Sequence, residues 1–274
     1  MPSFGVAIVT YNGPLRVSAL LDSLRPNREA VDQIVIFEDP SYPEVSRRLA
    51  ALAKEHGVAH KVRPEWGCMQ GNAAFAMQNM DTDIVCLLSD DILLTPTCLA
   101  DHRKVWERYW FYPIACAQIP YWGNWSDLIN LGLTQTQDAF YSEWPNYIKR
   151  IPRNKFWDHD GYPRLYVNVH GSGFSLRRDV YRSVGGFSPQ HWSYDEDIAA
   201  RIWLKSPCVV VAVPGSPFVH FGGASQCGNE HPDTQYHTLD AWIEAWGADK
   251  SAIHAQIRER MNERAYIDGY FRRS

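Results

Sequence analysis

The feature that most constrains the fold is a regular alternation of apolar, strand-like runs with helix-like patterns in the first third of the chain. The strand-like runs cover residues 4–10, 34–37, 58–62 and 84–88, and apolar residues at helical spacing fill 15–24, 43–56 and 73–80. Short apolar runs rich in branched residues indicate strands buried on both faces. Strands that alternate with helices predict an α/β fold, with a parallel sheet joined by right-handed crossovers.

Polar side chains follow three of these predicted strands at their carboxyl ends. They are Thr10, Asn12, Glu38, Asp39, Asp90 and Asp91. Open α/β sheets bind their ligands at this edge, so these side chains are candidates for a nucleotide or metal site. The adjacent carboxylates of Asp90 and Asp91 repel each other unless a cation or a proton offsets their charge. Capping of the next helix or turn is the alternative role for this pair.

Two common nucleotide-binding signatures are absent from the sequence. A dinucleotide site of the Rossmann type would need G-x-G-x-x-G after the first strand, where the chain has Thr-Tyr-Asn-Gly-Pro, and there is no P-loop. The hydrophobic content of 45% and charged content of 21% are ordinary for a globular protein. The net charge of −4 gives no general attraction to nucleic acid or to acidic membranes.

Cysteine usage and the chain start predict a cytoplasmic protein. None of the six cysteines forms a CxxC pair, and Cys86 and Cys208 lie in strand-like runs, which favours a reduced protein over a disulfide scaffold or a zinc site. The chain begins Met-Pro-Ser and continues into a strand, so no signal peptide is expected. No apolar run has the length needed to cross a membrane.

Residues 113–169 lack periodicity and predict loops with short elements, including a strand near 165–169. This stretch is aromatic, and it holds Trp122, Trp125, Trp144 and Trp157. Aromatic rings stack on the apolar faces of sugar rings, so an acceptor-binding wall is one interpretation. Simple packing of a loop-rich region is the other.

Three consecutive acids, Asp195, Glu196 and Asp197, open a predicted amphipathic helix with Ile198 and Ile202 on its apolar face. Acids in a first helical turn suit the helix dipole, and that effect accounts for one or two of them. Further along, His220 lies in an apolar run before two glycines. A histidine in such a run is either a core residue or a ligand.

The C-terminal region predicts helices. Leu239, Trp242, Ile243 and Trp246 have helical spacing, as do Ile253 and Ile257. The tail over 258–274 holds five Arg and three acids. It is expected to form a lid over a ligand site, a contact with an anionic acceptor, a subunit contact or a solvated helix.

The order and spacing of several motifs together resemble one family, the inverting glycosyltransferases of the GT-A fold, family-2 type, over about residues 4–225. The motifs are Ala7–Asn12, Glu38–Ser41, Gly71–Ala74, Ser89-Asp90-Asp91 at the DxD position, Gly-Ser-Gly-Phe-x-x-Arg-Arg at 171–178 with Gly185-Gly186-Phe187, the acids of 195–197 with Arg201, and His220.

The resemblance implies a mixed, mostly parallel, Rossmann-like central sheet flanked by helices. Residues 1–225 would form one domain, with a nucleotide-binding half over 1–95 and an acceptor and catalytic half over 96–225. Residues 226–274 would be a helical extension. The implied activity is inverting, metal-dependent transfer of a sugar from a nucleoside-diphosphate sugar, a UDP-sugar, to an acceptor hydroxyl. Such a reaction needs a cation on the diphosphate and a carboxylate base for the acceptor.

The resemblance also assigns residues to these tasks. Asp91 and His220 would hold Mn²⁺ or Mg²⁺ together with diphosphate oxygens, because hard oxygen ligands and an imidazole suit these ions. Ser89 replaces the first acid of the DxD motif. Asp90 would bind ribose or the donor sugar. The base and ribose pocket would be lined by Thr10, Tyr11, Asn12, Glu38, Asp39, Gly71 and Asn72.

Two registers compete for the general base. A base six residues before Arg201 would be Asp195, whereas the usual Glu-Asp motif would select Asp197. Successive side chains on a helix diverge by about 100°, so one or two of the three acids can face an acceptor. Asp195 is the first choice and Asp197 the second, and Glu196 would bind an acceptor hydroxyl.

Two other functions fit the same fold. A nucleotidyltransferase that makes nucleotide sugars would carry a Gly-rich, Arg-containing loop after the first strand, which residues 11–14 do not provide. An inactive nucleotide-sugar-binding module is the second alternative. The acceptor class stays open between a glycan, a lipid-linked glycan, a protein and a hydroxylated nucleobase.

Overall fold

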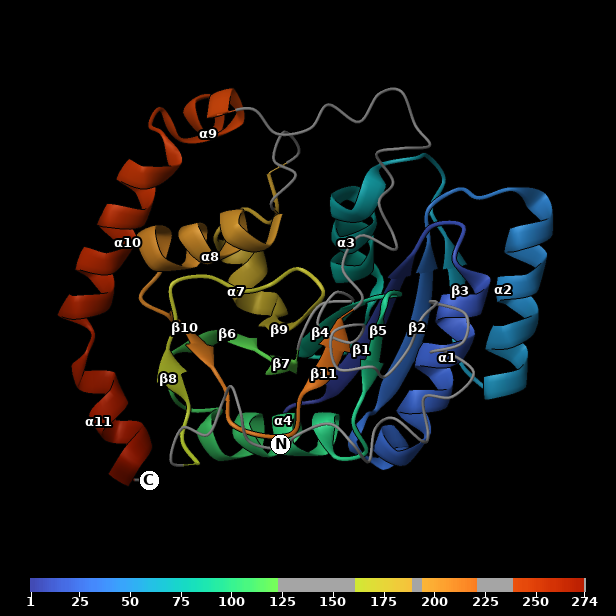
Figure 1. The fold of residues 1–274 in the computed structure, drawn as a ribbon. Coiled ribbons are helices and arrows are strands. Elements are labelled where there is room, and N and C mark those ends of the chain that lie inside the picture. The colour runs from blue at the N-terminus through green and yellow to red at the C-terminus, as the bar shows by residue number, and fades with distance from the viewer. Residues whose placement is uncertain (123–160, 189–193, 221–238, 274) are drawn as a thin grey trace, which may run out of the picture.

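The computed structural model describes residues 1–122, 161–188, 194–220 and 239–273. Its centre is an eight-stranded sheet of order β3-β2-β1-β4-β9-β6-β10-β8, and a second sheet has the order β5-β11-β7. Helices flank the large sheet (Figure 1). The α/β class and the mostly parallel central sheet predicted above are therefore confirmed.

The first half is built from consecutive β-α units. Its elements are β1 (Phe4–Thr10), α1 (Pro14–Leu24), the 3₁₀ helix η1 (Arg25–Ala30), β2 (Gln33–Glu38), α2 (Pro43–His56), β3 (Ala59–Val62), α3 (Cys68–Asn79) and β4 (Ile84–Ser89). β1 pairs in parallel with β2 and β4, and β2 pairs in parallel with β3. Every residue of β1 and β4 is buried, as expected for central strands covered on both faces.

Prolines and one glycine help to set the helix ends in this half. Pro14 and Pro43 occupy the first helical positions of α1 and α2, where a missing N–H costs nothing and the fixed φ suits the helix. Gly57 ends α2 with φ of 63°, the left-handed conformation that glycine adopts without strain.

The second half adds antiparallel strands to the sheet. Its elements are β5 (Ile92–Leu94), α4 (Cys98–Tyr109), β6 (Ile114–Gln118), β7 (Tyr121–Trp122), β8 (Arg164–Leu165), β9 (Gly173–Arg177), α7 (Arg178–Ser183), α8 (Tyr194–Lys205), β10 (Val209–Ala212) and β11 (Phe218–His220). β9 lies between β4 and β6 and is antiparallel to both.

One expectation for residues 113–169 needs correction, because the strand expected near 165–169 is limited to Arg164–Leu165. β6, Ile-Ala-Cys-Ala-Gln, is a fully buried short strand within the stretch expected to hold loops with short elements. Small residues suffice in β6 because strands on both sides and helices over the sheet bury it. The predicted acceptor wall at Trp125, Trp144 and Trp157 lies outside the described residues, and Trp122 is described only as part of β7.

The C-terminal helices are α9 (Leu239–Trp246), α10 (Lys250–Glu263) and α11 (Tyr266–Arg273). They run along the side of the molecule that carries α8 and β8, opposite α1 and α2 (Figure 1). Ile267 and Phe271 are buried, Tyr109 Oη donates to the carbonyl of Phe271 at 3.1 Å, and the amide of Leu165 donates to Asp268 at 3.0 Å. α11 is therefore docked on the core beside β8, which corrects the expectation of a solvated tail helix or a lid.

Among the residues that the model describes, none of the helices combines the length and the apolar character that a membrane span requires.

Candidate functional site

The carboxyl ends of β1, β2 and β4 lie side by side and form one edge of the site. Thr10 pairs with Glu38 across β1 and β2, and Val9 pairs with Ser89 across β1 and β4. Asn72, in the first turns of α3, donates from Nδ2 to the carbonyls of Thr10 at 3.3 Å and of Phe37 at 2.8 Å. The predicted strand-end residues are therefore neighbours, and α3 ties two of the strand ends together.

Asp90 is completely buried, and both of its oxygens accept hydrogen bonds. Thr10 Oγ1 donates to Oδ2 at 2.5 Å, and Arg16 donates from Nε to Oδ1 and from Nη2 to Oδ2, each at 3.2 Å. Burial raises the pKa of Asp90 to about 6, although Arg16 acts to lower it. A Cβ at Gly13 would lie 2.1 Å from Asp90 Oδ2, so the chain before α1 must carry no side chain there. Asp90 thus joins β4 to β1 and α1, and its predicted contact with the donor stays a prediction.

Glu38 and Asp39 are also buried, but each keeps one oxygen without a hydrogen-bond partner among the described residues. Ser46 Oγ donates to Glu38 Oε2 at 3.1 Å, and His60 Nε2 lies 2.7 Å from the same oxygen. Arg63 Nη1 donates to Asp39 Oδ1 at 3.4 Å. Burial raises the pKa of Asp39 to about 7, against the lowering effect of Arg63. Buried oxygens without partners are costly and mark a place where a ligand can donate.

Arg63 crosses the start of α3, where two glycines leave room for its guanidinium group. A Cβ at Gly67 would lie 1.3 Å from Arg63 Nη1, and one at Gly71 would lie 2.5 Å from it. Gly71, one of the predicted site residues, therefore leaves space for the guanidinium group of Arg63. The neighbouring predicted residue, Asn72, has a buried Oδ1 without a partner among the described residues.

Tyr11 and Asn12 form the turn after β1. The amide of Asn12 donates to Ser41 Oγ at 3.2 Å, and the amide of Tyr42 donates to Asn12 Oδ1 at 3.4 Å. Asn12 has φ of 51°, a left-handed conformation that asparagine tolerates better than most residues. The carbonyl of Tyr11 accepts from Arg16 Nη2 at 3.2 Å. This turn is thus bound to the chain after β2 and to the arginine that holds Asp90.

Asp91 and His220 are neighbours at one end of the second sheet, where β5 begins and β11 ends. His220 at the end of β11 pairs with Ile92 of β5, and His220 Nε2 lies 3.4 Å from Asp91 Oδ2. Ser89 Oγ donates to Asp91 Oδ1 at 2.5 Å, so the residue at the first DxD position orients the carboxylate. Ser172 Oγ lies 2.7 Å from His220 Nε2.

This pair fits a divalent cation. His220 is 9% exposed, its Nδ1 is buried without a partner among the described residues, and its Nε2 faces polar groups, unlike a histidine packed into an apolar core. One carboxylate oxygen and one imidazole nitrogen are ligands that Mn²⁺ accepts. Within the described ranges, no three His, Cys, Asp or Glu side chains form a metal-binding group. Among the described residues, Asp91 and His220 are the two ligands offered here, and a bound diphosphate or water can supply others.

The three acids at the start of α8 have different surroundings. Asp195 Oδ2 accepts from the amide of Gly171 at 2.7 Å, and Tyr194 Oη donates to the carbonyl of Gly171 at 2.5 Å. Burial raises the pKa of Asp195 to about 6, and the charge of Glu196 raises it further, while backbone N–H groups lower it.

Asp197 is 0% exposed and saturated with donors. Its Oδ2 accepts from the amide of Ser188 at 3.1 Å and from Arg201 Nε at 2.8 Å, and its Oδ1 accepts from Trp246 Nε1 at 3.0 Å. Its oxygens therefore point into protein. Glu196 accepts from Lys250 Nζ at 2.8 Å and from Asn168 Nδ2 at 3.3 Å.

The segment His170–Gly173 connects the acid helix to the Asp91–His220 pair. The amide of Gly171 binds Asp195, the hydroxyl of Ser172 contacts His220, and the ring of His170 meets that of His220 edge to face at 4.9 Å. Burial lowers the pKa of His170 to about 4. Sequence reasoning missed the roles of Arg16, Arg63, His170 and Ser172, because nothing in the local pattern marks which distant acid or histidine each of them meets.

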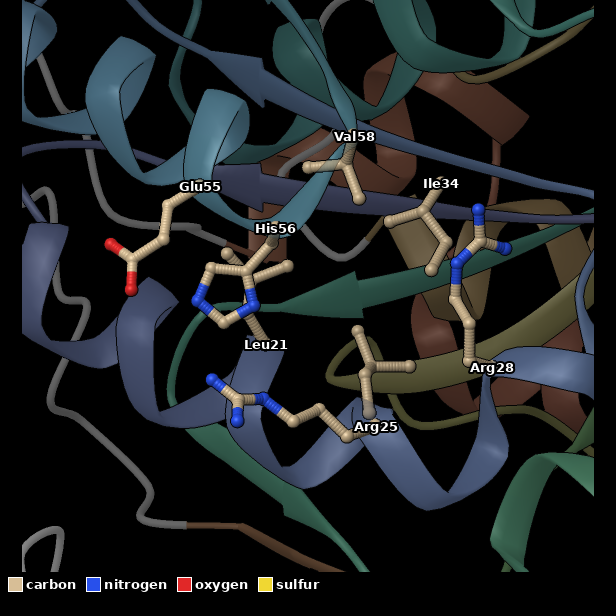
Figure 2. Close-up of a pocket in the computed structure, with 8 residues that line it drawn as sticks. Leu21, Arg25, Arg28, Ile34, Glu55, His56 and Val58 are labelled. Carbon is tan, nitrogen blue, oxygen red and sulfur yellow. The ribbon is translucent and has the colours of Figure 1, made fainter.

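A cavity of about 500 Å³ lies elsewhere, between the end of α1, η1, the start of β2 and the end of α2 (Figure 2). Leu21, Leu24, Ile34 and Val58 give it an apolar lining, and Arg25, Arg28, Glu55 and His56 add charged and polar groups. It lies toward the amino end of β2, whereas Glu38 and Asp39 lie at the carboxyl end. The cavity is therefore separate from the site described here.

Comparisons with known proteins agree with the fold. The model of the glycosyl transferase family 2 matches residues 5–185. The matched range includes the strand-end acids and ends before α8 and His220. A search of curated proteins by sequence finds no match.

Solved structures of similar fold include mannosyltransferase PcManGT from Pyrobaculum calidifontis, in complex with GDP-Man and Mn²⁺. It has a TM-score of 0.60 at 15% identity over 97% of this chain and 69% of its own. GalNAc-T7 with UDP, GalNAc and Mn²⁺ has a TM-score of 0.60 at 15% identity, and the match covers 96% of this chain and 55% of GalNAc-T7. S. aureus TarS 1-349 has a TM-score of 0.57 at 11% identity, with 80% and 60% covered. This chain thus spans little more than half of two of these structures.

Proposed function

Since this chain belongs to the glycosyl transferase family 2, we propose that it moves a sugar from a nucleoside-diphosphate sugar to an acceptor hydroxyl with inversion. UDP-sugars are the proposed donors. The observation that carries this proposal is the facing pair Asp91 and His220, held through Ser172 in the same segment that binds Asp195. A metal and diphosphate site beside a carboxylate base is the arrangement that such a transfer requires.

The donor nucleotide would bind at the ends of β1 and β2. The buried oxygens Glu38 Oε1 and Asp39 Oδ2, without partners in the described structure, are acceptors for ribose hydroxyls and for an N–H of the base. Arg63, beside Asp39 and the start of α3, keeps positive charge near this pocket. Thr10, Tyr11, Asn12, Gly71 and Asn72 would complete the pocket wall, with Asp90 fixing the strand end behind the ribose or donor sugar.

Asp91 and His220 would hold Mn²⁺ or Mg²⁺. PcManGT and GalNAc-T7, which share the fold, are complexed with Mn²⁺. When bound, the ion would neutralise charge on the leaving diphosphate. Ser89 would act by orienting Asp91, since its hydroxyl donates to that carboxylate, which explains how a serine serves at the first DxD position.

Asp195 would be the general base. A carboxylate whose pKa is raised to about 6 is still ionised at neutral pH and is a stronger proton acceptor than an ordinary aspartate. Asp197 is less suited, because three donors already occupy its oxygens. Glu196, paired with Lys250, would bind an acceptor hydroxyl through its remaining acceptor capacity.

The proposed step is a single displacement. The acceptor oxygen attacks the anomeric carbon from the face opposite the diphosphate, its proton passes to Asp195, and the bond from the anomeric carbon to the phosphate oxygen breaks. One new glycosidic bond forms as the nucleoside diphosphate leaves. One attack of this kind inverts the configuration at the anomeric carbon.

The test is nucleoside-diphosphate release from a donor panel of UDP-glucose, UDP-galactose, UDP-GlcNAc, UDP-GalNAc and GDP-mannose. Each donor is incubated with the protein and Mn²⁺, with and without EDTA, alone and with a mixed acceptor extract analysed by mass spectrometry. Release from a UDP-sugar that EDTA abolishes supports the proposal. Release from GDP-mannose only would refute the UDP assignment, and no binding or turnover of any donor would refute the transferase activity itself.

A further inference from the structure

The C-terminal helices α9 to α11, here called the C-terminal extension (239–273), supply contacts to the start of the acid helix α8 and to the chain just beyond its end. At the start of α8, Lys250 Nζ lies 2.8 Å from Glu196 Oε1 and 2.6 Å from Oε2, and Trp246 Nε1 donates to Asp197 Oδ1 at 3.0 Å. Beyond its end, Arg264 donates to the carbonyls of Cys208 at 2.7 Å and Ser206 at 3.0 Å.

Trp246 packs among three charged side chains of α8. Its ring is covered by Lys205 Nζ at 4.7 Å from the centroid and by Arg201 at 5.8 Å, and Arg201 also binds Asp197. The indole therefore contacts the buried carboxylate through its N–H and the two cations of α8 through its face. Such a set of contacts fixes the rotation of α8 about its axis as well as its height against the sheet.

The C-terminal extension contacts two of the three acids at the start of α8. Two of them, Glu196 and Asp197, receive donors from the C-terminal extension, whereas the Asp195 carboxylate receives the amide of Gly171 from the other side. With the second and third acids fixed, the direction of the first is determined by the helix geometry. The extension thus acts on Asp195 without touching its carboxylate.

We propose that Trp246 and Lys250 are positioning residues for the transfer reaction: they hold the first turn of α8 so that Asp195 faces the acceptor hydroxyl. This inference rests on the proposed function, with Asp195 as base. A misplacement of about 1 Å in a reacting group can lower a rate by about 10²-fold. Loosening the extension should therefore lower kcat and leave donor binding, which takes place at the ends of β1 and β2, unchanged.

The test compares Trp246→Phe and Lys250→Met with the matched control Arg260→Met. Trp246→Phe keeps an aromatic ring and removes the N–H, and Lys250→Met keeps the chain length and removes the charge. Arg260 is a half-exposed cation on α10, the helix that carries Lys250, and its side chain pairs with Glu263 at 2.9 Å. Lys250→Arg serves as the rescue variant.

Three quantities are measured for each full-length variant: kcat for nucleoside-diphosphate release from the donor that the panel identifies, the Kd of UDP with Mn²⁺, and hydrogen exchange of the amides in 194–205. We expect kcat to fall by about 10-fold to 10²-fold in Trp246→Phe and Lys250→Met. We expect the Kd to stay within about twofold, exchange in the first turn of α8 to quicken, and Lys250→Arg to restore most of kcat. Arg260→Met should match the wild type in all three.

Unchanged kcat and exchange in both variants would overturn the inference, and so would a loss of kcat matched by an equal weakening of UDP binding. Absence of turnover by the wild type would instead refute the proposed function. In that case the exchange measurement still decides the inference, because unaltered protection of 194–205 would mean that Trp246 and Lys250 do not hold α8.

Discussion

Two groups of acids meet their partners in different ways: the buried acids at the strand ends of the first half, and the acids at the start of α8, of which Asp197 is buried. At the strand ends, Asp39 and Asp90 each meet an arginine from the first half of the chain, and Glu38 and Asp39 each keep an oxygen without a partner among the described residues. At α8, Asp197 has three donors. Glu38 and Asp39 therefore keep open acceptors inside the protein, whereas protein donors fill the acceptors of Asp197.

The difference indicates that the two groups of acids serve different purposes. Unsatisfied buried acceptors are costly in a free protein and become favourable when a ligand supplies the missing donors. Satisfied acids around a reactive one fix its geometry, which is how a functional group is held ready for chemistry. The strand-end acids are thus suited to binding a donor, and the α8 acids to directing a base.

The largest expected effect is that of Asp195→Asn. The amide cannot accept a proton, so nucleoside-diphosphate transfer should slow by about 10²- to 10⁴-fold, the usual contribution of a general base. The substitution keeps the side-chain size, so the thermal unfolding midpoint should stay near that of the wild type. Full activity of Asp195→Asn would show that the base lies elsewhere.

Asp197→Asn should instead act on stability. It removes the carboxylate partner of Arg201, which is 14% exposed, and loss of one member of a buried ion pair costs about 3–5 kcal/mol of unfolding free energy. Chemical denaturation measures this loss. Asp249→Asn is the matched control: this exposed acid caps α10 through a 2.8 Å bond to the amide of Ala252, and asparagine is an equally good cap. If Asp197→Asn keeps the stability of the wild type but loses activity, Asp197 rather than Asp195 would be the base.

The rate should also depend on pH in a way set by Asp195. Burial raises the pKa of this group to about 6 in the free protein, and only the ionised form accepts a proton, so kcat/KM should be level above pH 7. Below pH 6 it should fall about tenfold for each pH unit as Asp195 becomes protonated. Asp195→Asn should remove this acidic limb, and a limb that persists in the variant would assign the titration to another group.

Arg63→Met should give the smallest effect, and the effect should be confined to binding of the donor nucleotide. Arg63 lowers the pKa of Asp39, so its removal should raise that pKa above about 7 and leave the acid mostly protonated at neutral pH. A neutral Asp39 accepts hydrogen bonds less strongly, and UDP should bind about tenfold more weakly, by calorimetry with Mn²⁺ present. The exposed Arg260→Met serves as control and should leave the Kd unchanged.

Sequence reasoning predicted the first half of the fold well, because its strands carry branched apolar residues that have few other uses. It missed β6 and β9, Ile-Ala-Cys-Ala-Gln and Gly-Phe-Ser-Leu-Arg, whose small and polar residues are buried only by their neighbours in the sheet. Local pattern cannot report burial that arises from tertiary packing.

The residues of the candidate site could likewise be predicted from the sequence only in part. Asp39 and Asp91 could be predicted to share an edge, because the carboxyl ends of parallel strands meet there. The partners Arg63, Trp246 and Lys250 could not, since each contact joins segments whose distance depends on the complete fold. The sequence also left Asp195 and Asp197 as alternatives, and only the hydrogen bonds of Asp197 separate their surroundings.

A crossed comparison of Asp39→Asn with Asp195→Asn tests most directly whether the strand-end acids bind the donor and Asp195 at the start of α8 acts as the base. Both variants are measured for the Kd of UDP with Mn²⁺ and for kcat at saturating donor. We predict that Asp39→Asn raises Kd and keeps kcat near the wild-type value, whereas Asp195→Asn keeps Kd and lowers kcat by about 10²-fold or more. Weaker UDP binding in Asp195→Asn, or lost kcat with normal binding in Asp39→Asn, would contradict the account.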